Sequence, residues 1–249
     1  MNRRQWLTAG ISTAAGAAGL TAAARIANKY GLIPPDHGGI YGPGEALTYA
    51  SQRLLTRHSL AREFSRAQIS NPPFANGEPL KTDAYQRLKA GDFAAWRLSI
   101  DGMVARPSTF SIDRLKAYPS ASQITHLACE EGWSFIAEWI GVRLTTVLNA
   151  AGILPEAKFV VYQSLEADWW DSIDMDDALH PQTLLAYGLN GGPLPPGHGG
   201  PLRMRVPRHL GYKSVKYITK LTVIDNLKSF RNGLGSTEPE AGYAWYAGI

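Results

Sequence analysis

The chain has 249 residues, of which 45% are hydrophobic and 18% are charged, with a formal net charge of +4. This length and composition allow a large buried core, while the mild charge without clustered lysine and arginine argues against a nucleic-acid partner. The single cysteine, Cys129, excludes an intrachain disulfide, so stability must come from burial, hydrogen bonds and any bound cofactor.

The first 24 residues have the layout of an export signal. Arg3 and Arg4 precede a weakly apolar stretch that is rich in alanine, glycine and threonine and ends in small residues. The arginine pair favours the twin-arginine route and therefore a periplasmic location. Two alternatives remain open, an amphipathic helix with solvated arginines and a retained membrane anchor, and we favour export over both.

Residues 25–94 are predicted to form a loop-rich segment with helical patches that packs on the main body. The stretch PPDHGGIYGPGEA is typical of turns, and EALTYASQRLLTRHSLAREF has apolar residues at helical spacing.

The core is predicted to span residues 95–225 and to begin with a strand. Trp96, Leu98 and Ile100 alternate with polar residues, and an Asp-Gly pair then supplies a turn. The run QITHLAC predicts a second strand that carries Cys129 to its end, immediately before the polar sequence EEG. Catalytic groups often lie where a strand passes into a loop.

The rest of the core mixes strands and helices without regular alternation. Residues 139–153 predict a turn followed by an amphipathic helix that ends at Gly152, and residues 171–179 predict a cap and a short helix. Strands are predicted at 158–165, 183–191, 201–207 and 214–225. The aromatic tail, 226–249, is expected to pack on the core. This pattern favours an α+β fold, built as a single mixed α/β domain.

A lone cysteine near an apolar strand is most often a small buried hydrophobe, but two neighbours alter this reading. Glu130 and Glu131 should raise the thiol pKa by charge repulsion and make Cys129 a poor nucleophile. A soft metal ion would overcome that repulsion, so the pattern suits a metal ligand better. A nucleophilic pair with His126 is disfavoured because residues three apart on a strand point to opposite faces.

Zinc is the first metal to consider, but the histidines form no HExxH or paired motif, which makes a zinc-dependent hydrolase a weaker alternative. Trp133 and Trp139 are interpreted as packing in the core or at the rim of a pocket rather than as substrate contacts.

A possible anion receptor follows at residues 190–216. Free backbone amides at Gly199 and Gly200 are combined with Arg203, Ser214 and Lys216, which together suit a phosphate group. The alternative is a loop rich in glycine and proline between strands, with solvated charges.

Two long stretches, THLACEEGWSFIAEWIGVRLTTVLNAAGI and LLAYGLNGGPLPPGHGGPLRMRVPRHLGYKSVKYITKLTVID, resemble the molybdopterin-binding domain of the sulfite oxidase superfamily. The resemblance covers about residues 95–225 and is greatest to the branch that contains the periplasmic methionine sulfoxide reductase catalytic subunit. It implies the fold of that domain and one molybdenum–molybdopterin per chain, with Cys129 as the metal ligand and catalytic residue.

The resemblance also implies contacts to the pterin and its phosphate. Arg203 and the run Ser214, Val215 and Lys216 match family positions directly. Two further contacts are implied by replacement, since Ser164 stands where the branch has threonine and His198 where it has asparagine. Asn71 is a weaker candidate for an N-terminal pterin contact.

The implied activity is oxygen-atom transfer coupled to two-electron redox chemistry. Sulfite oxidases follow their cysteine with a G-N-R-type sequence, whereas this chain has two glutamates that would repel sulfite. We therefore expect reduction of a sulfoxide or N-oxide, carried by a small molecule or a protein.

The haem and dimerisation domains of animal sulfite oxidases are missing, so we expect a separate electron-transfer partner, with a membrane haem protein as one candidate. Two alternatives remain open: sulfite oxidation at the same centre, and a non-catalytic exported pterin-binding module.

Overall fold

The structure, a computed structural model, describes residues 22–23, 25–38 and 41–249. All but two residues of the predicted export signal, 1–24, lie outside the described residues. The chain divides into two compact units, one that extends to Arg57 and one that spans His58–Ile249. The main element of the first unit is helix α2 (Gly42–Leu55), with Glu45 in its first turn and Arg53 in its last, where each charge complements the helix dipole.

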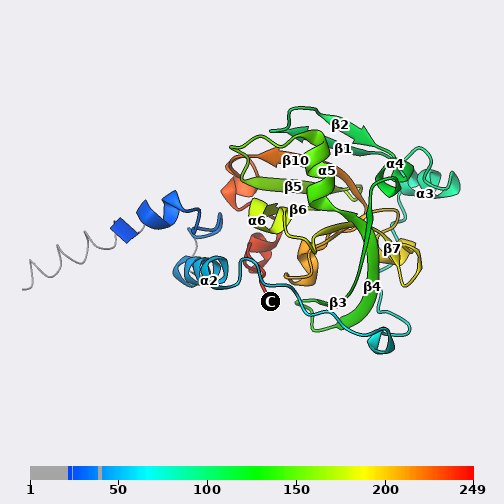
Figure 1. Cartoon of the computed structure of the whole chain (residues 1–249), viewed down its shortest axis with the longest axis horizontal. Helices are drawn as coiled ribbons and strands as arrows, with labels where there is room; N and C mark the ends of the chain where they lie inside the picture. Colours follow the sequence, from blue (N-terminus) through cyan, green and yellow to red (C-terminus); the bar gives the residue numbers. More distant parts are fainter. Residues whose placement is uncertain (1–21, 24, 39–40) are drawn as a thin grey trace, which may run out of the picture. The chain divides into compact units, whose positions relative to one another are not determined.

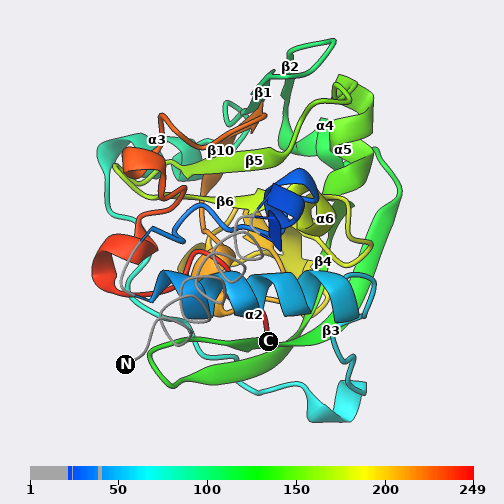
Figure 2. The ribbon, with the colours of Figure 1, turned by 90° about the vertical axis from the view of Figure 1, so that its left-hand side faces the viewer.

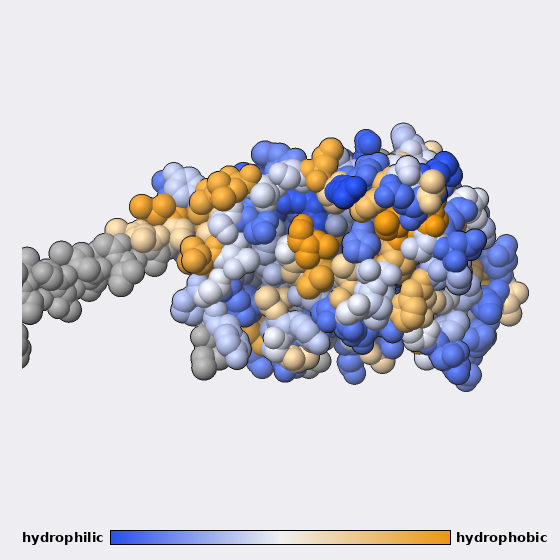
Figure 3. All heavy atoms as spheres, turned by 90° about the horizontal axis from the view of Figure 1, so that it is seen from below, coloured by the Kyte–Doolittle hydropathy of each residue, from blue (hydrophilic) through white to orange (hydrophobic). Residues whose placement is uncertain are grey.

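Within the described residues, no helix is both long and apolar enough to span a membrane. On the face shown in Figure 3, hydrophilic side chains dominate the second unit and apolar ones form small separate groups.

The second unit contains two five-stranded sheets. The first sheet crosses the upper part of this unit in Figure 1, and its strands follow one another from top to bottom in Figure 2. Strands β1 and β10 are parallel, and the other pairs are antiparallel. In spatial order the strands are β2 (Ser108–Phe110), β1 (Leu98–Gly102), β10 (Ile218–Ile224), β5 (Phe159–Ser164) and β6 (Trp170–Asp174).

The second sheet is antiparallel and is dominated by a long hairpin of two strands in the lower part of Figure 1. The hairpin pairs with a third strand, which a short fourth and fifth strand join. The strands are β3 (Ser120–Ala128), β4 (Ser134–Arg143), β7 (Leu184–Leu189), β8 (Gly192–Pro193) and β9 (Arg203–Arg205).

Short helices connect the strands of both sheets. Helix α5 follows β4 directly, buries one apolar face and ends at Gly152, whose φ of 73° forms a left-handed cap. With α5 (Leu144–Ala151) included, the helices of this unit are η1 (Arg66–Gln68), α3 (Asp83–Ala90), α4 (Ile112–Lys116), α6 (Met175–Ala178), η2 (Pro196–His198), η3 (Gly211–Lys213), η4 (Arg231–Gly233) and η5 (Glu238–Ala241).

Two apolar clusters form the core. The larger one combines the first sheet with α5 and with Met204 of β9, and the smaller one gathers around Trp139 on β4. Because side chains alternate along a strand, Arg203 and Arg205 lie on the opposite face of β9 from Met204. Both guanidinium groups lie over the Trp139 ring, at 5.5 Å and 5.2 Å.

The mixed fold predicted from the sequence is confirmed, but two local predictions are wrong. Residues 139–143 form the end of β4 rather than a turn, and residues 170–174 form β6 before the short helix that begins at Met175. In both places the backbone pairs with a neighbouring strand that is distant in sequence.

The C-terminal tail packs on the second unit. Trp245 is buried, and its Nε1 donates to Ser172 Oγ at 2.8 Å. Residues 58–94 belong to this unit as well, since the Tyr85 hydroxyl donates to the Gly200 carbonyl oxygen at 2.7 Å.

The close pairing of β4 with β7 predicts that one methyl group added at Gly141 lowers the stability of the fold. A Cβ at Gly141 would overlap the Leu185 carbonyl oxygen and lie 2.8 Å from Ala186 Cα. We expect Gly141→Ala to lower the free energy of unfolding by about 1–3 kcal/mol in chemical denaturation, since a packed strand cannot easily move aside. Gly192→Ala is the matched control, because its nearest contact is 3.8 Å away; equal denaturation midpoints for the two variants would contradict this view.

Candidate active site

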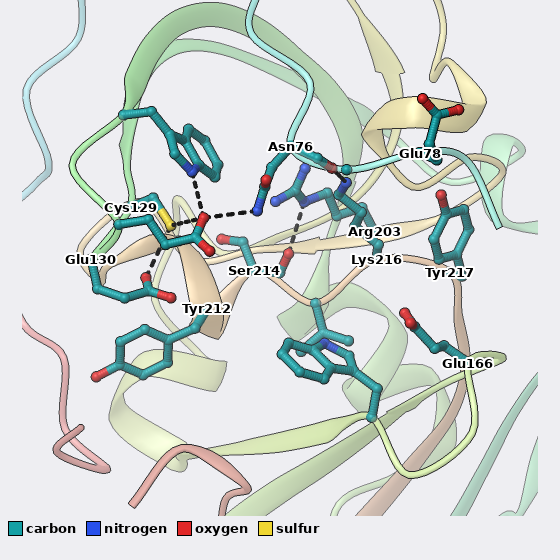
Figure 4. A pocket seen from close by; sticks show the side chains of 16 residues that line it. Asn76, Glu78, Cys129, Glu130, Glu166, Arg203, Tyr212, Ser214, Lys216 and Tyr217 are labelled. Carbon is teal, nitrogen blue, oxygen red and sulfur yellow. Dashed lines mark hydrogen bonds between the residues drawn. The ribbon is translucent and has the colours of Figure 1, made fainter. Parts of the chain in front are cut away.

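A cleft of about 270 Å³ opens where the loop after β3, the segment before β10 and the segment around Asn76 meet. This volume is close to the smallest small-molecule sites, roughly 300 Å³. Figure 4 shows the side chains that line it, with the Cys129 sulfur on one side and Arg203 and Lys216 on the other. The cleft therefore joins two segments that lie about eighty residues apart in the sequence.

Cys129 begins the five-residue loop that connects β3 to β4. Its N–H donates to the Trp133 carbonyl oxygen at 2.9 Å, and its own carbonyl accepts from Gly132 N–H at 3.1 Å. Gly132 has a φ of 91°, which a residue with a side chain rarely adopts. The hairpin thus fixes the position of Cys129 through backbone hydrogen bonds.

Two carboxyl groups face the thiol. Cys129 Sγ donates to Glu130 Oε2 at 3.1 Å and lies 3.7 Å from Glu131 Oε2. The pKa of the Cys129 thiol is raised to about 12, with burial as the largest cause; the hydrogen bond and charge of Glu130 act in the same direction, while a backbone hydrogen bond at Glu131 opposes them. The direction matches the sequence-based expectation, but burial is a larger cause than the carboxylates.

Arg203 forms the wall of the cleft that lies opposite Cys129. Its side chain is buried and reaches this wall from the protein interior. Its Nε donates to the Ser214 carbonyl oxygen at 2.8 Å and its Nη1 to the His198 carbonyl oxygen at 3.2 Å. Burial lowers the pKa of Arg203 to about 10, an effect that Tyr217 and Cys129 partly offset. No carboxylate of the described chain lies within salt-bridge distance of this guanidinium.

Lys216 is a second cation at the same wall. Its Nζ donates to the backbone carbonyls of Asn76, at 2.6 Å, and Gly197, at 2.8 Å. Burial and the neighbouring Arg203 lower the pKa of Lys216 to about 8, which Glu166 partly offsets. Like Arg203, it forms no ion pair with any carboxylate in the described part of the chain.

Ser214 and Val215 complete this wall. Ser214 Oγ accepts from Val206 N–H at 3.2 Å, and both residues are buried and line the cleft. The preceding Lys213 is anchored deep in the fold, where its Nζ donates to Asp171 Oδ1 at 2.6 Å. This buried ion pair fixes the segment that carries Ser214 and Val215 on its side away from the cleft.

Aromatic and amide side chains also line the cleft: Trp133, expected from the sequence to pack in the core or at the rim of a pocket, and Asn76, Trp169 and Tyr212, which no sequence pattern had marked. Trp133 Nε1 donates to Glu131 Oε2 at 2.6 Å, and Asn76 Nδ2 donates to the same oxygen at 3.0 Å. Asn76 and Trp169 lie in loops without a motif, so only their place in the folded chain identifies them.

Three candidate residues lie outside the lining of the cleft. Ser164 Oγ accepts from Glu166 N–H at 3.0 Å, and Asn71 is exposed. His198 is buried against Phe135, at 5.5 Å between ring centroids, and burial together with Arg203 and Lys216 lowers its pKa to about 4. By contrast, Cys129, Arg203, Ser214, Val215 and Lys216 all line the cleft.

The cleft has opposite chemistry at its two walls. Arg203 and Lys216 provide positive charge and form no ion pair with a carboxylate among the described residues, which suits a phosphate or another anion. The other wall offers a thiol, which suits a soft metal ion. Within the described residues, no group of three or more His, Cys, Asp and Glu side chains is placed to hold a metal ion by itself. A metal carried on an anionic organic group fits this donor set.

Comparison with known proteins gives a family match. The model of the family described as oxidoreductase molybdopterin binding domain matches residues 85–230. A protein of Azospira oryzae named "Putative protein-methionine-sulfoxide reductase subunit YedZ1" is 37% identical over 199 residues, which cover 78% of this chain and 70% of that protein.

Two further similarities are more partial. The protein-methionine-sulfoxide reductase catalytic subunit MsrP of Xanthomonas axonopodis pv. citri is 34% identical over 59% of this chain, a match that spans only half of the relative's length. The crystal structure of the sulfane dehydrogenase SoxCD from Paracoccus pantotrophus matches with a TM-score of 0.51 and 27% identity, over 53% of this chain and 38% of that chain.

The raised pKa of Cys129 predicts a slow thiol in the metal-free protein. Iodoacetamide at pH 8 should alkylate folded protein at least about tenfold more slowly than the same protein in urea, because the thiolate is the reactive form. Mass spectrometry over time measures both rates. Equal rates in the folded and unfolded protein would show that the surroundings of Cys129 do not suppress its ionisation.

Proposed function

The chain belongs to the oxidoreductase molybdopterin-binding domain family, and from this premise we propose that it is an exported, molybdenum-dependent reductase of a sulfoxide or N-oxide. One observation carries the proposal: the single thiol of the chain lines the same cleft as two cations that form no ion pair with any described carboxylate. A molybdenum–pterin group would supply two-electron redox chemistry and exchange of an oxygen atom.

The residues of the cleft have separate tasks in this proposal. Cys129 Sγ would provide the soft anionic ligand to one molybdenum per chain, because coordination removes the thiol proton despite the raised pKa. Arg203, Lys216 and Ser214, with the backbone at Val215, would hold the phosphate of the pterin. His198 would act through its carbonyl oxygen, which orients Arg203.

The carboxyl groups beside the thiol favour a neutral substrate over an anionic one. Glu130 and Glu131 lie on the wall that carries Cys129, so an incoming sulfite would meet like charges. Trp133, Trp169 and Tyr212 give the cleft apolar faces that suit the carbon groups of a sulfoxide. Reduction takes two electrons and two protons, and it releases the thioether and water.

The cellular setting is part of the proposal. The paired Arg3 and Arg4 support export by the twin-arginine route to the periplasm, since that route carries folded proteins with their cofactors. Electrons would come from a separate protein, with a membrane haem protein as one candidate. The names of the similar proteins support this arrangement, because they describe those proteins as subunits.

Metal analysis tests the cofactor directly. Protein from a host that makes molybdopterin should contain close to one molybdenum per chain, and Cys129→Ser should abolish viologen-linked sulfoxide reduction while the fold is retained, because a hydroxyl is a poorer ligand than a thiolate. Circular dichroism provides the control for folding. Folded protein without molybdenum, or normal turnover by the serine variant, would refute the proposed ligand.

Exchange of one carboxylate tests the choice of substrate. We expect Glu130→Gln to raise the ratio of kcat/KM for sulfite to kcat/KM for sulfoxide at least about threefold, since one like charge near the reacting group is worth roughly 1 kcal/mol in a solvated site. Glu156→Gln, at an exposed glutamate outside the cleft, is the matched control. An unchanged ratio in Glu130→Gln would rule out repulsion as the basis of selectivity.

A further inference from the structure

Arg205 is a buried arginine that neither the family resemblance nor the cleft lining accounts for. It lies on β9, fully buried, and does not line the cleft. Its Nη2 donates to the His126 carbonyl oxygen at 2.6 Å and to Thr125 Oγ1 at 3.2 Å, and its Nη1 contacts Ser214 Oγ at 3.4 Å. Arg205 thus connects the end of β3, three residues before Cys129, to the segment that forms the anion-binding wall.

The charge of Arg205 has no counter-charge in the described protein. No carboxylate forms an ion pair with it, and its Nε is buried without a hydrogen-bond partner. Burying an ion costs several kcal/mol unless an opposite charge compensates. A buried guanidinium in this state points to a missing anion close by.

Arg205 lies close to other positively charged groups, and their mutual repulsion affects the pKa values in this region. Burial and the charge of Arg203 lower the pKa of Arg205 to about 9, and burial and Arg205 lower the pKa of His126. Arg203 and Arg205 share one face of β9, and Lys216 lies on the same wall as Arg203. Arg203 and Lys216 thus line the cleft and Arg205 lies behind its lining, and none of the three forms an ion pair with a carboxylate in the described part of the chain.

We propose that Arg205 is a positioning residue for the anion that Arg203 and Lys216 bind, acting as a second layer of positive charge and as a tie between Ser214 and the strand that carries Cys129. This inference rests on the proposed cofactor site and deepens it. It also predicts that repulsion among these buried cations destabilises the fold of the protein without a bound anion, and that a bound anion stabilises it.

Inorganic phosphate is the probe for this inference. Full-length protein from a host that cannot make molybdopterin is titrated with phosphate, and with chloride at equal ionic strength, while Tm is measured. We expect the Tm of the unaltered protein to rise with phosphate and not with chloride. Because the cofactor is not involved, failure here would leave the molybdenum measurement as an independent test of the proposed function.

Three variants separate positioning from a merely structural role. Arg205→Met should leave Tm without phosphate unchanged or higher, because it removes an uncompensated buried charge, and should weaken phosphate binding at least about tenfold. Arg205→Lys retains the charge and should bind phosphate within about threefold of the unaltered protein. Arg208→Met is the matched control, since Arg208 is buried but pairs with Asp177 at 3.5 Å; its Tm should fall while its phosphate response persists.

The outcomes decide the inference. An unaltered protein without a phosphate-dependent rise in Tm overturns it, and so does an Arg205→Met variant that keeps the full rise. If the methionine variant does not fold, the lysine variant decides: a retained rise supports the inference, and loss of the rise overturns it. In protein that carries the cofactor, Arg205→Met should also lose molybdenum faster during dialysis than Arg208→Met does.

Discussion

The structure depends on positive charges that are buried without an ion-pair partner among the residues it describes. Arg203 and Arg205 lie side by side on one short strand and share the Trp139 ring, while Lys216 approaches from the following segment. Their hydrogen bonds go to backbone carbonyls and hydroxyl groups, which orient the cations but do not neutralise them. Burying such charges is costly unless an opposite charge compensates them, which is the basis for proposing an anionic ligand here.

The two sheets are arranged so that this charge faces the single thiol. The β3–β4 hairpin presents Cys129 at its tip, and the chain from β9 to β10 presents Arg203, Ser214 and Lys216. Contacts between residues that are distant in the sequence fix the positions of both segments. The buried pair of Lys213 with Asp171 and the packed tail around Trp245 hold the second segment against the first sheet.

The thiol illustrates how the folded environment changes the chemistry of a residue. Without a metal, burial and the nearby carboxyl groups raise the pKa of Cys129 and favour its protonated form. The same surroundings suit a coordinated sulfur, because a metal ion supplies the positive charge that the wall around Cys129 lacks. In the proposed function, the acidic and aromatic side chains beside it set which substrates can approach.

The sequence by itself determined the mixed α and β character, most strands, the helix that ends at Gly152 and the family, because these follow from alternation, helical spacing and a dense local motif. It also identified Cys129, Arg203, Ser214, Val215 and Lys216 as candidates. Only the tertiary structure gathered these residues into one cleft, left Ser164, His198 and Asn71 outside its lining, and added Asn76, Trp169 and Tyr212. It also decided that residues 139–143 extend β4 and that Arg205 is buried with no counter-charge among the described residues. Strand pairing and ion pairing depend on which distant residues meet in the folded chain. A local sequence pattern does not contain this information and could not predict either feature.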